Sequence, residues 1–370
     1  MTEANAKKGV TVTLRDVARE CGLSATTVSM VLSHSPMATY IPEHTKQRII
    51  HVAEALGYQP NPFAQALRKR HSHTVGVMVP DIADPYCAQI LRGIENSLSH
   101  SNYVPFLVDI QNNRLRFKKY LNVLLARRVE GLIILANSLS FESELLSTLE
   151  RQKIPSVILG REPGTDALSW VTTDNEAGTH QALEYLYRLG HRKIAFIRGP
   201  KMIIDSHHQW SGICSFAAAS GLEIDPKLVL TLTDPFSSYE AGYERTKDLL
   251  SLQRPFTAVV AFDDMTAFGC IRALISAGLR VPADCSVIGF DDIPAAAFYN
   301  PALTSVREHM ATLASMGSEI LMEAIRAHRK NAAVTPVHHK VRPELIVRES
   351  TAPRLDRRDR SLSAFVSTSS

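Results

Sequence analysis

The sequence contains no long run of apolar residues. Of its 370 residues, 45% are hydrophobic and 21% are charged, which is an ordinary composition for a chain with two or three packed units. No stretch reaches the roughly 18 consecutive apolar residues that a membrane helix needs, and the polar start MTEANAKKG lacks the apolar segment of a signal peptide. We therefore expect no membrane partner and a cytoplasmic location.

Cysteine is scarce and scattered. The five cysteines form no C-x-x-C pair and no regular framework, so the sequence predicts neither a zinc site nor disulfides. The pairs His207-His208 and His338-His339 do not make a metal site by themselves, because neighbouring side chains point to different sides of a helix or strand. We expect no metal and no cofactor.

The short motifs of common enzyme classes are also absent. The sequence has no G-x-x-x-x-G-K-[ST], no G-x-G-x-x-G after a strand, no G-x-S-x-G and no H-E-x-x-H. Their absence argues against P-loop, dinucleotide-binding, serine-hydrolase and zinc-peptidase chemistry. We therefore expect a protein that is not an enzyme and has no catalytic residue.

Positive charge is concentrated near the start of the chain. The formal net charge is +4, and residues 1–73 hold nine Lys and Arg against five Asp and Glu, so the remaining residues sum to zero. A modestly basic segment joined to a neutral body fits a nucleic-acid-binding module attached to another domain. Many solvated helical faces carry a similar charge, so the charge alone does not show that this segment binds nucleic acid.

Residues 13–32 predict two short helices. Thr13 followed three residues later by Asp16 makes a capping box, in which both side chains satisfy backbone donors of the first turn. Gly22 ends this helix, and Ser24 can cap a second one at once. The apolar stripe of the first helix is Leu14, Val17, Ala18 and Cys21, at the i, i+3, i+4 and i+7 spacing.

A third helix follows Pro42 and ends before Gly57, so three small helices share one small core. On this pattern alone, the bundle could be a protein-interaction module. The small residues Ala25 and Thr26 at the start of the second helix favour DNA, because a helix entering the major groove must bring its first turn close to the base edges.

These helices resemble the LacI/GalR family of bacterial repressors. The match runs through T-L-R-D-V-A, then G-L-S-x-x-T-V-S-x-V-L, then A-E-A-L-G-Y-Q-P-N-P. The resemblance implies a helix-turn-helix DNA-binding domain over residues 11–59, with Ala25, Thr26 and Met30 at base-reading positions. The places that contact or position phosphate are Thr13, Leu14, Ser24, Thr27, Ser29 and Thr45.

Two features depart from the family. Met30 stands where the family usually has Arg, so one charged contact is missing and the operator preference is expected to shift there. The loop after Leu32 is also longer than in the family, with Ala38, Thr39 and Tyr40 as the extra residues. The family's DNA contacts from that loop therefore cannot be assigned to residues of this chain.

Residues 60–73 read as a linker that becomes a helix on DNA. A helix of about ten residues is marginal in water because nucleation is costly. The resemblance implies that two such hinge helices, one per subunit, enter the minor groove of a palindromic operator and that Leu67 wedges between base pairs. The alternative is a solubilising linker with one incidental leucine. The other hinge positions implied to contact DNA are Asn61, Ala64 and Arg68.

From residue 74, apolar runs of strand length alternate with helical stretches. TVGVMVP, YVPFLVDI, GLIILAN and PSVILG form one series, and KIAFIRGP, LVLTL, TAVVAF and SVIGFDD form another. Such runs are typical of parallel strands buried on both faces, so we expect two doubly wound α/β lobes. This part resembles type I periplasmic-binding-protein folds. The expected lobes are residues 74–172 plus 305–334 and residues 173–304 plus 335–352.

Such folds bind a ligand between the lobes, at the carboxyl ends of strands. Gln209 stands where sugar-binding members commonly have Arg, and Asp263 where they have Asn. Losing a cation and gaining an anion disfavours an anionic effector and leaves a neutral or a cationic one open. We expect Asp264 only to cap the next helix. The effector-binding residues implied by the resemblance are Asp84, Tyr86, Gln209, Phe236, Asp263 and Asp291.

The sequence therefore predicts a sequence-specific transcriptional repressor whose operator affinity is controlled by a small molecule, such as a sugar or related metabolite. Its location would be the bacterial cytoplasm, on the nucleoid. Residues 353–370 hold four Arg against two Asp and no leucine heptads, which predicts a homodimer with a disordered tail. The alternative is a solute-binding receptor without DNA-linked regulation, which would need an export signal and no DNA-binding unit.

Overall fold

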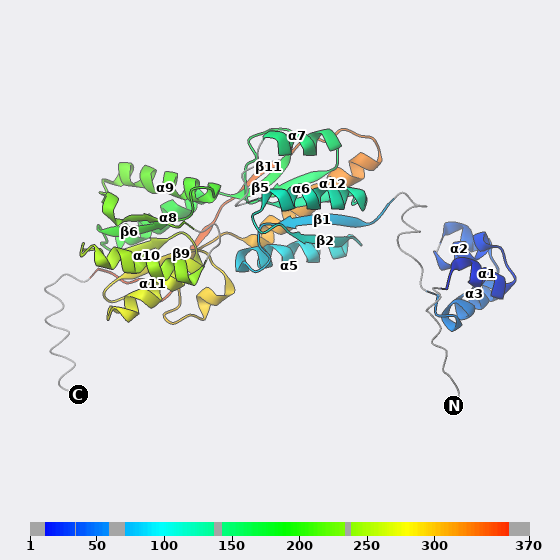
Figure 1. The fold of residues 1–370 in the computed structure, drawn as a ribbon, viewed down its shortest axis with the longest axis horizontal. Helices are drawn as coiled ribbons and strands as arrows, with labels where there is room; N and C mark the ends of the chain where they lie inside the picture. The colour runs from blue at the N-terminus through cyan, green and yellow to red at the C-terminus, as the bar shows by residue number, and fades with distance from the viewer. Residues whose placement is uncertain (1–11, 34, 59–70, 137–142, 234–237, 355–370) are drawn as a thin grey trace, which may run out of the picture. The chain divides into compact units, whose positions relative to one another are not determined.

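The computed structural model describes residues 12–33, 35–58, 71–136, 143–233 and 238–354. The chain forms two compact units, residues 1–72 and 73–370. The first unit is helical and the second is a two-lobed α/β domain (Figure 1).

The helical unit is a three-helix bundle around one small core. Its core centres on Val17, Val28 and Ile49, none of which is exposed to solvent. The predicted capping box is present, since the Asp16 carboxylate accepts the Thr13 backbone N–H at 2.9 Å. The helices are α1 (Leu14–Cys21), α2 (Ala25–Leu32) and α3 (Glu43–Ala55).

The extra residues between α2 and α3 form a 3-10 helix, η1 (Pro36–Tyr40). The Ser35 hydroxyl caps it by accepting the backbone N–H of Met37 at 3.3 Å. The sequence predicted the extra length but not a regular turn, because helices this short have no apolar period to detect.

The first lobe is a parallel sheet with helices on both faces. Successive residues of β1 point to opposite faces, so Val75 and Val77 pack with the core that holds α5 and α12, while Met78 packs with the core that holds α6. The strand order is β11-β5-β4-β3-β1-β2. The strands are β1 (Thr74–Val79), β2 (Val104–Asp109), β3 (Gly131–Leu135), β4 (Ser156–Leu159), β5 (Ser169–Thr173) and β11 (His338–Val341). The helices are α5 (Pro85–His100), α6 (Arg114–Ala126), α7 (Ser143–Gln152) and α12 (Met310–Arg329).

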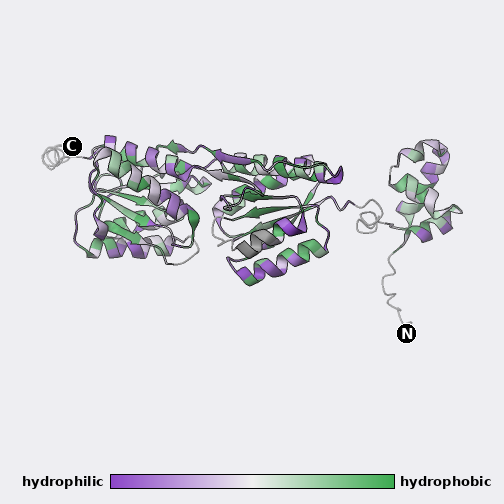
Figure 2. Cartoon of the chain, turned by 90° about the horizontal axis from the view of Figure 1, so that it is seen from above, coloured by the Kyte–Doolittle hydropathy of each residue, from purple (hydrophilic) through white to green (hydrophobic). Residues whose placement is uncertain are grey.

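The second lobe repeats this strand order as β12-β10-β9-β8-β6-β7, and β12 runs antiparallel to β10. Figure 2 shows hydrophobic strands between helices that carry hydrophilic residues. The strands are β6 (Ile194–Arg198), β7 (Val229–Thr231), β8 (Ala258–Ala261), β9 (Ser286–Asp291), β10 (Thr304–Arg307) and β12 (Glu344–Ile346). The helices are α8 (Asn175–Arg188), α9 (Ile204–Ser220), η2 (Pro226–Leu228), α10 (Tyr239–Ser251), α11 (Asp264–Ser276) and η3 (Pro294–Ala297).

The expected division between the lobes is wrong at two strands. β10 belongs to the second sheet, although it was expected in the first lobe, and β11 belongs to the first sheet, although it was expected in the second. Three of the four residues of β11 are exposed, so its sequence HHKV lacks the apolar run by which a buried strand is recognised. The chain therefore crosses between the lobes after β5, after β10 and after β11.

Hydrogen bonds tie the three crossings together. The Thr173 hydroxyl, at the end of β5, donates to the Glu308 carboxylate, just after β10, at 3.0 Å. The backbone N–H of Asp174 donates to the carbonyl of Val341, at the end of β11, at 3.0 Å. Movement of one lobe against the other must therefore act on all three segments.

The end of the described chain is attached to the second lobe. The Arg354 N–H donates to the Leu189 carbonyl at 2.8 Å, so the predicted tail is joined to the lobe at its second residue, and residues 355–370 lie outside the described part. Among the described residues, no helix combines the length and the apolar character needed to cross a membrane.

Gly242 and Gly269 let α10 and α11 pack in direct backbone contact. A Cβ at Gly269 would overlap the carbonyl oxygen of Tyr239 and lie 2.6 Å from the backbone N of Tyr243. We expect Gly269→Ala to lower the free energy of unfolding by about 1–2 kcal/mol, since overpacking outweighs the gain in helix propensity. Urea denaturation measures this. Ser276→Ala, at the exposed end of the same helix, is the control, and an equal effect of both changes would contradict the prediction.

Candidate functional site

The exposed start of α2 is the surface that the sequence predicted to meet DNA. The Ser24 hydroxyl accepts the backbone N–H of Thr27 at 3.1 Å and lies 2.8 Å from the Thr27 hydroxyl. Ala25 and Thr26 are exposed, whereas Met30 is half-buried. The first turn of α2 is thus fixed by its cap and carries only small side chains, so another surface can come close to its backbone.

The other predicted DNA contacts of the helical unit lie at helix starts or on α2. The Thr13 hydroxyl donates to Asp16 at 2.6 Å, and Leu14 is the first residue of α1. The Thr45 hydroxyl, in the first turn of α3, lies 3.1 Å from the ring Nε2 of His44. Ser29 lies on α2 and is half-buried. Helix starts carry free backbone N–H groups, which suit phosphate.

The hinge residues and one effector residue lie outside the described residues. These are Asn61, Ala64, Leu67, Arg68 and Phe236.

A small cavity in the two-lobed domain brings five of the six predicted effector residues together. Its volume is about 30 Å³, which is about the volume that one water molecule occupies in the liquid. The predicted members are Asp84, Tyr86, Gln209, Asp263 and Asp291, and the others are Asp205, Phe262 and Glu308. Both lobes contribute, because Asp84 and Tyr86 come from the first and the others from the second or from a crossing.

Helix starts hold three of the cavity's acids in place. Asp84 caps α5 by accepting the Tyr86 N–H at 2.9 Å, and Asp263 caps α11 by accepting the Thr266 N–H at 2.7 Å. Asp205, in the first turn of α9, accepts a hydrogen bond from the Asn175 amide at 2.8 Å. These carboxylates have both the structural role of a cap or tie and a place on the cavity wall.

Two neighbouring acids at the end of β9, Asp291 and Asp292, have different surroundings. Asp292 lies 2.7 Å from Arg307 and 2.6 Å from Arg348, so its charge is compensated within the lobe. Asp291 lines the cavity, and no described residue donates a hydrogen bond to its carboxylate. Its φ of 102° lies in a region that side chains rarely adopt, which is the kind of backbone strain found at functional sites.

The expectation for Asp264 is wrong. Its neighbour Asp263 is the residue that caps α11. Asp264 is completely buried and accepts hydrogen bonds from the Ser305 hydroxyl at 2.5 Å and the Ile293 N–H at 2.8 Å. It therefore ties α11 to β10 and to the loop after β9, and only the tertiary fold brings these partners together.

Burial keeps two of the cavity's acids, Asp84 and Glu308, partly protonated near neutral pH. It raises the pKa of Asp84 to about 7, although the Tyr86 N–H lowers it. It also raises the pKa of Glu308 to about 7, against the hydrogen bonds from Thr173 and Tyr86. The pKa values of Asp205 and Asp291 are raised by burial and then by the Glu308 carboxylate. Several acids in one small space cannot all ionise at low cost.

Three residues of the cavity were not predicted. Asp205 lies one helical turn before Gln209, so the i, i+4 spacing placed both on one face of α9 and was a usable signal. Phe262 directly precedes Asp263 at the end of β8. Glu308 follows β10, and because that strand was not recognised from sequence, nothing marked the residue after it.

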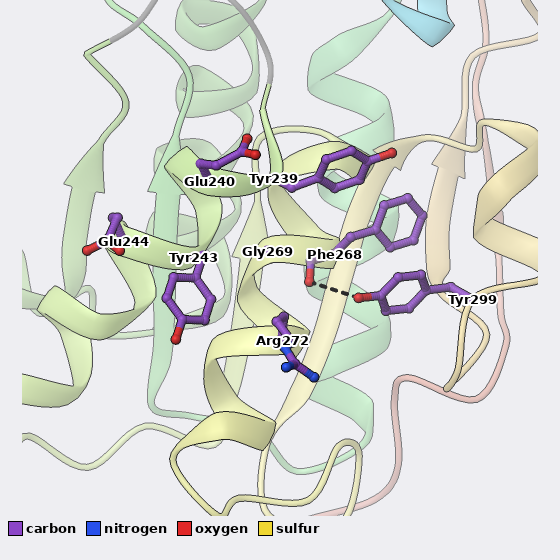
Figure 3. Close-up of a pocket in the computed structure, with 8 residues that line it drawn as sticks. All are labelled: Tyr239, Glu240, Tyr243, Glu244, Phe268, Gly269, Arg272 and Tyr299. Atoms are coloured by element: carbon purple, nitrogen blue, oxygen red, sulfur yellow. Dashed lines mark hydrogen bonds between the residues drawn. The ribbon is translucent and has the colours of Figure 1, made fainter.

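A second hollow lies on α10 and α11 of the second lobe. Figure 3 shows its aromatic side chains, and its volume is about 300 Å³. The rings of Phe268 and Tyr299 stack at 4.3 Å between centroids, and Tyr239 stacks on Phe268 at 6.0 Å. The Tyr299 hydroxyl donates to the Phe268 carbonyl at 3.4 Å. Tyr239 is 45% exposed, so the hollow presents aromatic surface to solvent.

The helix-turn-helix unit and the two-lobed domain with its internal polar cavity define a class of protein, the DNA-binding regulators that respond to a small molecule. Residues 13–61 match the family described as bacterial regulatory proteins, lacI family, and residues 183–351 match the periplasmic binding protein-like domain.

Individual relatives are similar to this chain over most of its length. The transcriptional repressor PurR of Pasteurella multocida is 30% identical over 344 residues, covering 93% of this chain and 99% of the relative. The lac repressor dimer bound to operator and the anti-inducer ONPF has a TM-score of 0.81 at 26% identity and covers 92% of this chain and 99% of its own. A LacI family regulator from Enterococcus faecium with bound ribose is 30% identical, has a TM-score of 0.66 and covers 76% of this chain and 100% of its own.

The chain belongs to the LacI family of bacterial transcriptional regulators. It is a DNA-binding regulator whose operator binding is modulated by a small molecule.

Stability should depend on the protonation of Glu308. Its pKa rises from 4.5 when the chain is unfolded to about 7 in the fold, so folding favours the protonated acid, and this stabilisation is lost as the pH rises from about 4.5 through about 7. We expect Glu308→Gln, which stays neutral, to raise the melting temperature at pH 8 by roughly 2–5 °C relative to the parent, and to have a smaller effect at pH 5.

Thermal unfolding across this pH range measures the difference between the two proteins. Glu323→Gln, an exposed position on α12, controls for the loss of one surface charge. A Glu308→Gln difference that does not grow with pH would contradict the assigned direction.

Proposed function

We propose that the chain is a repressor that binds a palindromic operator as a homodimer, and that an effector held between its lobes sets its affinity for DNA. The observation that carries this proposal is the polar cavity between two lobes joined by three crossings, in a chain that also carries a helix-turn-helix unit. The names of the relatives support it, since PurR is a repressor and the lac repressor was captured as a dimer on its operator.

On DNA, we propose that Ala25, Thr26 and Met30 read base edges in the major groove. The capped first turn of α2 supports this, because small side chains allow close approach. The hydroxyls and helix starts would fix the register on phosphate. The proposed phosphate-contacting or positioning residues are Thr13, Leu14, Ser24, Thr27, Ser29 and Thr45. The proposed hinge contacts are Asn61, Ala64, Leu67 and Arg68.

For the effector, we propose a sugar or related metabolite held by the carboxylates, the amide of Gln209 and the ring of Tyr86. Acids and amides can accept or donate hydrogen bonds to polar groups of the ligand, while rings cover its apolar faces. Phe236 is proposed as a further ring on the ligand. The Gln209 amide donates to the Phe262 carbonyl at 3.2 Å, so an effector would have to share it or displace this bond.

Coupling between the sites would follow from the crossings. A cavity of about 30 Å³ is too small for a whole sugar, so effector binding requires the lobes to separate. Because Thr173 and Glu308 link two crossings at the cavity wall, ligand contact with Glu308 would act on the segments that set the lobe angle. Such coupling is typically worth about 1–3 kcal/mol and is reciprocal between ligand and DNA.

For the dimer, we propose that the aromatic face of α10 and α11 meets its copy in the second subunit. A contiguous patch of exposed aromatic side chains is more often a protein interface than a surface that stays in contact with solvent. Because operator DNA lies in the bacterial cytoplasm, that is where we propose the protein acts, on the nucleoid. We propose no catalytic role, in line with the names of PurR, CytR and the lac repressor, which are transcriptional repressors.

Selection of bound duplexes from a random DNA pool, repeated with a panel of metabolites, tests the proposed function. We expect a symmetric consensus whose recovery changes with one compound. Recovery of unselected sequences in every condition would overturn the proposal.

The same selection tests base reading by α2. Thr26→Val removes a hydroxyl without changing the side-chain shape, so we expect about tenfold weaker binding to the parent's consensus and relaxed preference at one base pair per half-site. His51→Ala, an exposed change on α3, should leave both unchanged. An unaltered consensus with Thr26→Val would remove Thr26 from the base-reading set.

The dimer face is tested by Tyr239→Asp. A carboxylate in the first turn of α10 suits the helix start, so the fold should tolerate it, while a charge in the aromatic interface should weaken dimerisation more than tenfold. Sedimentation equilibrium measures this. Val347→Asp, at a side chain that is 52% exposed, is the matched control. A dimer of unchanged affinity would place the interface elsewhere.

A further inference from the structure

We propose that the effector of this protein carries a primary ammonium group, which binds among the carboxylates between the lobes. This inference rests on the proposed function of that cavity as the effector site. It narrows the effector from a neutral or cationic metabolite to an amine.

The charge of the cavity wall has one sign. Five of the eight lining residues are acids, and none of the eight is Lys, Arg or His. The acids are Asp84, Asp205, Asp263, Asp291 and Glu308. Outside the eight lining residues, the guanidinium of Arg161 lowers the pKa of Asp205. A cationic ligand would compensate the remaining charge, whereas an anion would add to it.

Hydrogen bonding in the cavity points the same way. On the cavity wall, Asp291 accepts no hydrogen bond from a described residue. Ionised carboxylates only accept hydrogen bonds, so the wall has more acceptors than donors. A primary ammonium supplies three donors and a hydroxyl supplies one.

The size of the cavity selects the kind of cation. About 30 Å³ holds one water-sized group, which fits an –NH₃⁺ head but not a trimethylammonium. The rest of the molecule must lie where the lobes open. Tyr86 and Phe262 also line the cavity, and aromatic rings there would contact the carbon next to the ammonium and favour its charge.

Because two of the cavity's acids titrate near neutral pH, the proposal predicts that the affinity for the amine depends on pH. The titratable and charged groups around Asp84 and Glu308 are the other three acids of the cavity, Asp81, Cys87, Tyr86 and, beyond Asp205, Arg161. Because burial raises the pKa of Asp84 and Glu308 to about 7, both are partly protonated at pH 6, and an ammonium must displace those protons. Amine binding should therefore be tighter at pH 8 than at pH 6, with proton release. A neutral ligand gains no such attraction as the acids ionise.

Isothermal titration of the full-length dimer with matched pairs tests the proposal. The probes are ethanolamine, putrescine and glucosamine, each compared with its hydroxyl counterpart, ethylene glycol, butane-1,4-diol or glucose. We expect at least one amine to bind more than tenfold tighter than its counterpart, and more tightly at pH 8 than at pH 6. Asp291→Asn should weaken that amine tenfold or more, whereas Asp166→Asn, an exposed acid in the same domain, should not.

Three outcomes would overturn the amine. One is a hydroxyl counterpart that binds as tightly as its amine, another is Mg²⁺ or Ca²⁺ binding that Asp291→Asn abolishes, and the third is failure of every amine to bind. Binding of the selected operator DNA is measured in the same protein preparations. It distinguishes failure of the amine proposal from failure of the proposed function. A neutral compound that changes operator binding would reject the amine and keep the regulator, whereas the absence of any preferred duplex would reject the function itself.

Discussion

Repulsion among the acids held between the two lobes is the constraint on which the rest of this protein depends. Helix caps, a strained strand end and one crossing segment bring these carboxylates around a space that holds about one water. Separated lobes would hydrate the acids, whereas closed lobes require protonation or a partner for them. The free energy of lobe closure is therefore sensitive to what occupies the cavity, and this sensitivity is what a ligand-controlled regulator needs.

Adjacent aspartates show how the fold assigns different roles to identical side chains. Asp292 is compensated by two arginines, and Asp264 by a hydroxyl and a backbone N–H inside the second lobe. Their neighbours Asp291 and Asp263 reach the cavity instead. One acid of each pair is held inside the lobe, and the other lies on the cavity wall. Substitution within a pair should therefore separate stability from sensing.

The crossings extend this local chemistry through the large domain. Glu308 lies both on the cavity wall and at a crossing, where it accepts the hydroxyl of Thr173 from another crossing. Backbone contact between α10 and α11 at Gly269 gives the aromatic surface on these two helices a closely packed support. Packed cores do not deform continuously, so under the proposed function a ligand at the cavity would rotate one lobe against the other through the linked crossings.

The sequence by itself determined the elements with local signals. The capping box at Thr13, the cap at Ser24 and the apolar strand runs depend on neighbours within a few residues, and five of the six cavity residues proposed from family position do line one cavity. Only the tertiary structure decided that β10 and β11 exchange lobes, that Glu308 joins the cavity and that Asp264 is a buried tie. The hydrogen bonds of Asp264 and Glu308 join residues that are 29 to 135 positions apart, and β11 pairs with a strand 168 residues earlier. No local pattern encodes such contacts.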